Sequence, residues 1–130
     1  MKENKKAYVI AIRVLEYCTK ETGFYASGLP GGYEATWARD SMITGLGVSV
    51  VNAKVIGHKL KIGFTKSIEL LSKNQSKHGQ IPNAVGSWNT ERRSDVTFNS
   101  IDSTLWYLIG QQVYAKAYKT KSLLTKYKKN

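Results

Sequence analysis

Apolar residues recur every three or four positions in several stretches of this sequence, which is the spacing of an amphipathic helix. The pattern predicts helices over 5–22, from about 36–39 to 54, over 58–77, over 99–118 and over 121–128. In the first helix the expected apolar stripe is Tyr8, Ile12, Leu15 and Cys18 or Thr19. In the third helix it is Leu60, Phe64, Ile68 and Leu71. In the fourth helix it is Ile101, Leu105, Leu108 or Ile109, and Val113. The chain is therefore predicted to be all-α, with about five helices in a single domain over 1–130.

Two long polar segments, 23–36 and 78–98, interrupt the helical pattern, and each runs into the start of a predicted helix. The first segment is rich in glycine and has room for strand or hairpin fragments, whereas the second is a long loop of the kind that is usually functional or disordered. Short connections join the other helices, which favours stacked helical hairpins with the long loops at one end. Gly45 and Gly47 lie inside the second helix, so we expect another helix or a substrate to approach closely there.

Composition narrows the function classes. The net charge is +11, but 8 of these charges lie in residues 1–6 and 116–130, and the excess is mostly lysine. That distribution favours a lysine-rich surface over a nucleic-acid interface, because base recognition relies heavily on arginine.

The longest apolar runs are far too short to span a membrane. The basic, partly apolar N-terminus predicts a first helix, with a signal peptide as the alternative.

Metal and cofactor chemistry has little support in the sequence. One cysteine, Cys18, excludes a disulfide framework and a cysteine-cluster metal site, and a buried thiol is compatible with a cytoplasmic location. His58 and His78 are 20 residues apart with no cluster of ligands around either one. We expect neither a metal nor a cofactor.

Most of the chemistry lies where the long segments meet helices. "GGYEATWARDSM" holds Trp37, Arg39 and Asp40, and "FNSIDSTLWYL" holds Asp102 and Trp106. Each residue has a simple structural explanation: Thr36 and Asn99 are possible N-caps, an acid three residues after Asn99 suits a capping box, and tryptophans fill cores. Taken together, however, Asp and Arg suit vicinal sugar hydroxyls, and Trp rings cover the apolar face of a pyranose.

The segments "GYEATWARDSMITGLG", "NQSKHGQIPN" and "FNSIDSTLWYLIGQQVY", taken in order, resemble signatures of the six-hairpin α/α-toroid glycosidases, most closely the amylo-α-1,6-glucosidase (glycogen-debranching) type. The resemblance implies a partial α/α toroid and an α-glucosidic substrate in a glucan or oligosaccharide. It implies that Trp37, Arg39 and Asp40 bind the released sugar and that Asp102 is the general acid. Trp106 and Tyr107 would belong to the pocket wall, and Asn83 to the substrate-binding loop before the acid.

The implied chemistry also places two conflicting requirements on Asp102. A helix N-terminus stabilises the ionised form of Asp102, whereas a general acid must hold a proton. In the family the partner carboxylate is a glutamate on a later helix, but no acidic residue follows Asp102 here, and six hairpins need far more than 130 residues. We therefore expect the first part of a catalytic domain, inactive alone, with apolar helix faces exposed for association. A non-catalytic carbohydrate-binding module is the alternative, and a basic nucleic-acid binder is less favoured.

Overall fold

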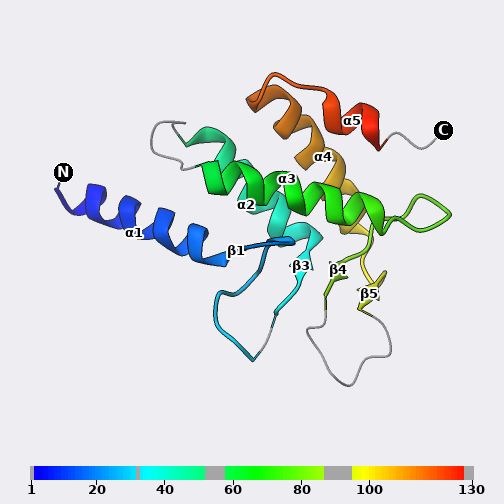
Figure 1. Cartoon of the computed structure of the whole chain (residues 1–130), viewed down its shortest axis with the longest axis horizontal. Helices are drawn as coiled ribbons and strands as arrows, with labels where there is room; N and C mark the ends of the chain where they lie inside the picture. Colours follow the sequence, from blue (N-terminus) through cyan, green and yellow to red (C-terminus); the bar gives the residue numbers. More distant parts are fainter. Residues whose placement is uncertain (1, 32, 52–57, 87–94, 128–130) are drawn as a thin grey trace.

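The computed structural model describes residues 2–31, 33–51, 58–86 and 95–127, and over these ranges it confirms a mostly helical fold (Figure 1). The helices run close to the predicted ranges. They are α1 (Lys2–Cys18), α2 (Ala38–Val50), α3 (His58–Lys73), α4 (Asp102–Ala117) and α5 (Ser122–Lys126).

Two small antiparallel sheets accompany the helices. In the first, β1 (Thr19–Lys20) pairs with β2 (Gly23–Phe24). The second has the order β3 (Thr36–Trp37), β4 (Ala84–Val85) and β5 (Val96–Thr97). Only strand fragments in 23–36 were expected from the sequence, so β4 and β5 correct the prediction of an unstructured loop over 78–98. The three-stranded sheet matters because it joins the two long segments that lead into α2 and α4.

Both predicted N-caps are wrong. Helix α2 begins after Trp37 and helix α4 after Ile101, and neither position makes a side-chain capping bond. Thr36 is engaged in the β3–β4 ladder instead. The backbone N–H of Asn99 donates to Asn83 Oδ1 at 2.9 Å, which keeps Asn99 in the loop before the helix.

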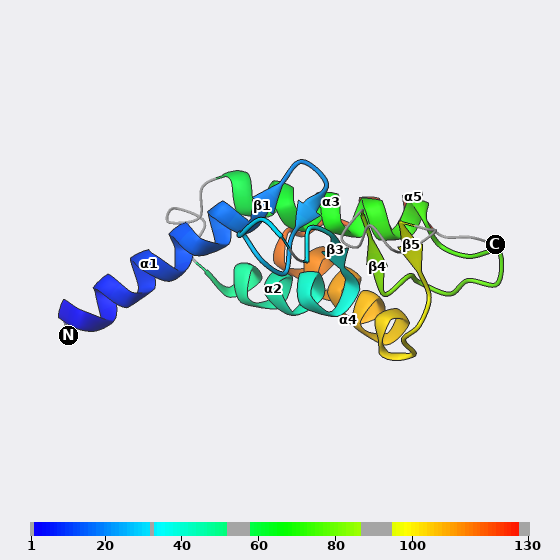
Figure 2. The same cartoon turned by 90° about the horizontal axis from the view of Figure 1, so that it is seen from below.

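The core is built around α3, which runs antiparallel to α2 and α4 (Figure 2). Its predicted stripe is confirmed, since Leu60, Phe64, Ile68 and Leu71 are all fully buried. Gly45 of α2 also behaves as expected, because a Cβ at this position would overlap the Phe64 ring. Gly47 differs, because it faces open space and no helix in the described part of the chain packs against it.

Helix α4 contradicts its predicted stripe. Ile101 is 90% exposed and Leu105 is 58% exposed, and Leu108 and Ile109 also face solvent, while Val113 is half-buried. The buried residues of α4 are Ser103, Tyr107, Gly110, Gln111 and Tyr114. Tertiary contacts with α2 and α3 account for this choice of face.

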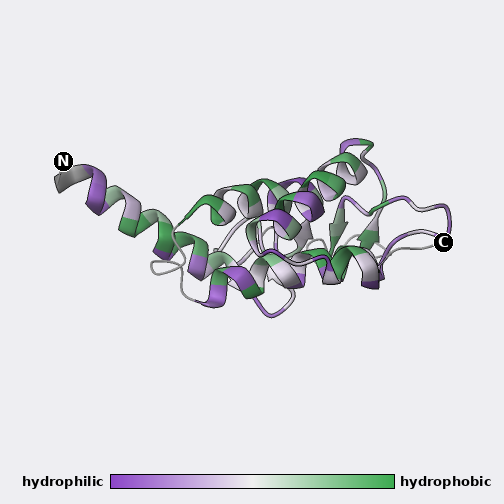
Figure 3. Ribbon diagram, turned by 90° about the horizontal axis from the view of Figure 1, so that it is seen from above, coloured by the Kyte–Doolittle hydropathy of each residue, from purple (hydrophilic) through white to green (hydrophobic). Residues whose placement is uncertain are grey.

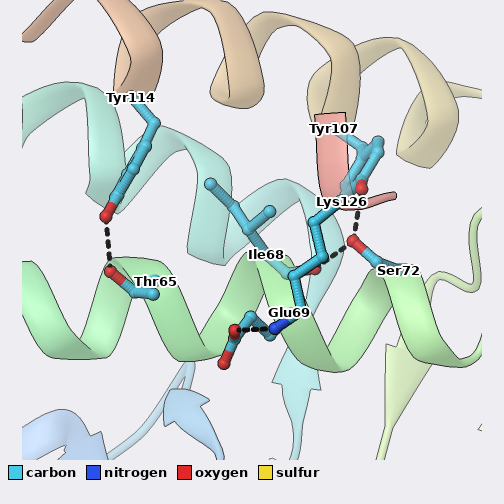
Figure 4. A network of polar contacts seen from close by, with 7 residues as sticks. All are labelled: Thr65, Ile68, Glu69, Ser72, Tyr107, Tyr114 and Lys126. Atoms are coloured by element: carbon cyan, nitrogen blue, oxygen red, sulfur yellow. Dashed lines mark hydrogen bonds and ion pairs between the residues drawn. The ribbon is translucent and has the colours of Figure 1, made fainter. Parts of the chain in front are cut away.

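Two kinds of contact hold the unexpected face of α4 inward. Gly110 lets Met42 of α2 pack directly on the α4 backbone, because any Cβ there would overlap the methionine side chain. Towards α3, the Tyr107 hydroxyl forms a hydrogen bond with Ser72, and the Tyr114 hydroxyl forms one of 2.8 Å with Thr65 (Figure 4). Helix α5 then packs on α4, and Lys126 forms an ion pair of 3.0 Å with Glu69.

Helix α1 projects away from the helical body towards the N-terminus, with apolar and polar residues alternating along it (Figure 3). Of the predicted stripe, Ile12 is buried and Leu15 is partly buried, whereas Tyr8 is exposed. Thr19, which comes directly after the helix, is also buried. Val9 and other apolar side chains of α1 also face solvent. None of the helices in the described ranges is long and apolar enough to cross a membrane.

Candidate functional site

The site lies where the N-terminal ends of α2 and α4 meet. These two helices pack against each other more extensively than any other pair of elements. Arg39 is in the first turn of α2, and Asp102 is the first residue of α4. Arg39 Nη1 donates to Asp102 Oδ2 at 2.8 Å, although 63 residues separate the two along the chain. The structure therefore brings together the central residues of the two predicted motifs.

The carboxylate of Asp102 has a second partner. The Ser100 hydroxyl donates to its other oxygen, Oδ1. These two contacts, first from the Ser100 hydroxyl and then from the Arg39 guanidinium, hold the pKa of Asp102 below its ordinary value. The ionised carboxylate accepts both bonds, whereas a protonated acid loses acceptor capacity. The expected conflict with a general-acid role is thus present in the structure.

Beside this ion pair lies an open pocket of about 480 Å³, lined by Tyr33, Trp37, Arg39 and Asp40 together with Ala26. The rings of Tyr33 and Trp37 lie 5.6 Å apart between centroids and are tilted by 54°. Tyr33 has a φ of 54°, a left-handed conformation that is rare for a bulky side chain. Tyr33 was not among the predicted site residues, although it lies in the same stretch "GGYEATWARDSM" as Trp37, Arg39 and Asp40.

A second hollow of about 320 Å³ shares Ala26, Arg39 and Asp40 with the first. On its far side it is lined by α1 and by the segment after β2, including Cys18 and Tyr25. The partly exposed Cys18 thiol is therefore less buried than the sequence suggested. Because the same Arg and Asp border both hollows, a ligand bound at this pair has space on either side.

Asn83 lies between the two halves of the site. Its backbone carbonyl accepts from the Ala38 N–H at 2.9 Å, and its own N–H donates to the Thr97 carbonyl at 2.8 Å. Its side-chain Oδ1 accepts from the Asn99 N–H. The structure thus ties Asn83 to the protein backbone on three sides.

The two aromatic residues of α4 that were predicted to belong to the pocket wall both have contacts with the protein interior. Trp106 is partly buried and packs against the hydrophobic core. Tyr107 is buried, with its hydroxyl bonded to Ser72 and Gln111, and this burial raises the pKa of Tyr107. In the described parts of the chain, no group of three or more His, Cys, Asp or Glu residues is arranged to hold a metal.

The fold and the site together define a helical protein that gathers an arginine, two aspartates and aromatic rings at the ends of two adjacent helices. A family model described as amylo-alpha-1,6-glucosidase matches residues 10–129. The chain therefore belongs to the amylo-alpha-1,6-glucosidase family. Comparisons with curated proteins and with solved structures give no match.

Proposed function

We propose that this chain provides the sugar-binding and general-acid side of a glycosidase acting on α-glucosidic linkages of a glucan or oligosaccharide. The observation that carries the proposal is the Arg39–Asp102 contact beside the pocket lined by Trp37 and Asp40. Membership of the amylo-alpha-1,6-glucosidase family supports the same substrate class. The proposed setting is a partial α/α toroid in the cytoplasm.

Each residue of the proposed site has a chemical task. Arg39 and Asp40 bind vicinal sugar hydroxyls through charge-assisted hydrogen bonds. The Trp37 ring covers the apolar face of the sugar, Trp106 supports the site from the core, and Asn83 belongs to the same binding region. Asp102 is the general acid, and it can protonate the glycosidic oxygen only when a second carboxylate beside it raises its pKa so that it holds a proton. The hollow on the other side of Arg39 and Asp40 supports an oligosaccharide rather than a single sugar.

Hydrolysis requires a second carboxylate that acts as base or nucleophile. No acidic residue follows Asp102 in these 130 residues, and the Ser100 and Arg39 contacts keep Asp102 ionised. We therefore propose that the base comes from a separate helical segment. This segment would pack on the exposed apolar faces of α1 and α4, burying Val9, Leu105 and Leu108 among others.

The experiment measures binding and turnover separately. Purified chain is titrated with maltotriose and with an α-1,6-branched glucan oligosaccharide by calorimetry, and the same mixtures are assayed for released glucose. We expect binding without turnover. Trp37→Ala should weaken binding by about tenfold because one stacking contact is lost. Tyr17→Ala removes an exposed aromatic outside the site and serves as the control.

Two results would overturn parts of the proposal. A wild-type chain that binds neither oligosaccharide contradicts the sugar-binding role itself. Robust glucose release that disappears in Asp102→Asn contradicts the claim that the base is missing.

A non-catalytic carbohydrate-binding module is the second candidate, and the ionised state of Asp102 favours it. It predicts that Asp102→Asn retains most of the sugar affinity and that no added segment restores turnover. A nucleic-acid role predicts instead an affinity that falls steeply with salt, and the clustering of charge at the chain ends argues against it.

A further inference from the structure

Asn83 is hydrogen-bonded to both halves of the site. Its carbonyl receives the N–H of Ala38, the first residue of α2, directly before Arg39. Its side-chain Oδ1 receives the N–H of Asn99, one residue before Ser100. The backbones that carry the Arg39 guanidinium and the Asp102 carboxylate are thus both hydrogen-bonded to a single residue.

The residues around Asn83 reinforce this link. Ile81 donates its N–H to Thr104 Oγ1 in the first turn of α4 at 3.2 Å, and the Gln80 amide donates to the Phe98 carbonyl at the same distance. Pro82 is fully buried and restricts the backbone on both of its sides. Segment 80–83 is therefore attached to the start of α4 at several points, and Asn83 is the point that also reaches α2.

Asparagine suits this position chemically. Its side chain offers a carbonyl acceptor without a negative charge. An aspartate would offer the same acceptor but would add a second negative charge to the site. The contact being held is a 2.8 Å ion pair, whose hydrogen bond depends on both the distance and the angle between the two groups.

We propose that Asn83 is a positioning residue of this site: its side-chain carbonyl fixes segment 99–102 so that Asp102 meets Arg39. The inference rests on the proposed function and changes one part of it, because Asn83 acts through Asn99 and not by touching the sugar. It also explains how two motifs 63 residues apart are brought to hydrogen-bonding distance.

The test uses the full chain and solution NMR, so its first readouts need no ligand. In Asn83→Ala we expect the Asn99 amide proton to shift upfield because its acceptor is lost. We expect the carboxyl of Asp102 to titrate at higher pH, closer to its ordinary value of 3.8, because the Arg39 contact loosens. Affinity for maltotriose should fall severalfold. Asn99→Ala is the matched control, because it keeps the backbone N–H and should behave as wild type.

The outcomes separate a positioning role from a direct one. An unchanged Asn99 amide and unchanged Asp102 titration, combined with lost maltotriose affinity, would make Asn83 a direct ligand and overturn the inference. If Asn83→Ala does not fold, Asn83→Asp decides, because it keeps the acceptor oxygen and should keep the Asn99 amide protected from exchange with solvent; an amide that exchanges rapidly in this variant overturns the proposal. If wild type binds no sugar, the proposed function fails while the NMR readouts still judge the role of Asn83.

Discussion

Helices α3 and α4 have 16 residues each and lie side by side in the core, yet only one of them follows its sequence pattern. All four predicted stripe residues of α3 are buried, whereas Ile101, Leu105 and Leu108 of α4 face solvent. The difference shows when a hydrophobic stripe is informative. A stripe identifies the buried face only if the opposite face is clearly polar.

The two helices differ in this opposite face. Helix α3 carries Lys59, Lys61 and Lys66 away from its stripe, so only one orientation keeps the charges in water. Helix α4 has no charged residue between Asp102 and Lys116, and apolar residues occur all around it. Its orientation is therefore decided by shape and by hydrogen bonds to its neighbours, through Gly110 and the two tyrosines.

The largest expected difference comes from truncating one apolar side chain on each helix. Phe64→Ala in α3 should lower the free energy of unfolding by about 3–5 kcal/mol, because it leaves a cavity in a closely packed core. Leu108→Ala in α4 should change it by no more than about 0.5 kcal/mol, because this side chain is 54% exposed. Urea denaturation measures both. Comparable losses would mean that the outer face of α4 is covered in solution, for example by self-association.

A smaller effect tests the hydrogen bonds that orient α4. Tyr107→Phe should cost about 1–3 kcal/mol, because it deprives Ser72 and Gln111 of a buried partner. Tyr118→Phe is the matched control. The buried hydroxyl of Tyr118 has no hydrogen-bond partner among the described residues, so its loss should be neutral or slightly stabilising. Equal effects of the two substitutions in thermal unfolding would contradict the role given to Tyr107.

Two glycines of α2 sharpen the comparison further. Gly45→Ala pushes a methyl group against Phe64 of α3. Overpacking of this kind lowers the free energy of unfolding by about 1–3 kcal/mol, which outweighs the gain in helix propensity. The net loss should be roughly 1 kcal/mol after that gain of about 1 kcal/mol. Gly47→Ala meets open space and should raise stability by up to about 1 kcal/mol. The opposite signs are the critical observation, and a gain in both variants would refute the close packing of α2 on α3.

The smallest effect concerns pH and the start of α4. The Ser100 and Arg39 contacts lower the pKa of Asp102 in the folded state. They therefore stabilise the fold at pH values above 3.8, the ordinary pKa of an aspartate. This stabilisation is lost as the pH falls below 3.8 through the lower folded value. The melting temperature of wild type should therefore exceed that of Asp102→Asn near neutral pH, and the gap should close in acid. Arg39→Gln should reproduce part of the loss, and a gap that widens in acid would reverse the assigned sign.

Much of the site was predictable because its residues stand together in short motifs. Arg39 and Asp102 were named from the sequence, and their contact at 2.8 Å is the central feature of the structure. The position of Asn83 between two helix starts was not predictable, since it depends on a sheet whose strands have only two residues each. Tyr33 was missed for a similar reason: nothing in its neighbourhood signals a left-handed backbone that places its ring beside Trp37.

The sequence by itself determined the helical class, the approximate helix ranges, the buried stripe of α3 and the motifs that carry the family resemblance. These features depend on local spacing and residue type, which remain the same wherever the segments pack. Only the tertiary structure decided which face of α4 turns inward and how the two long segments join through β3, β4 and β5. It also decided that Asp102 is held ionised by Ser100 and Arg39. The physical reason is that these features arise from contacts between segments far apart in the chain, where shape and hydrogen-bond partners choose among arrangements that hydropathy alone allows equally.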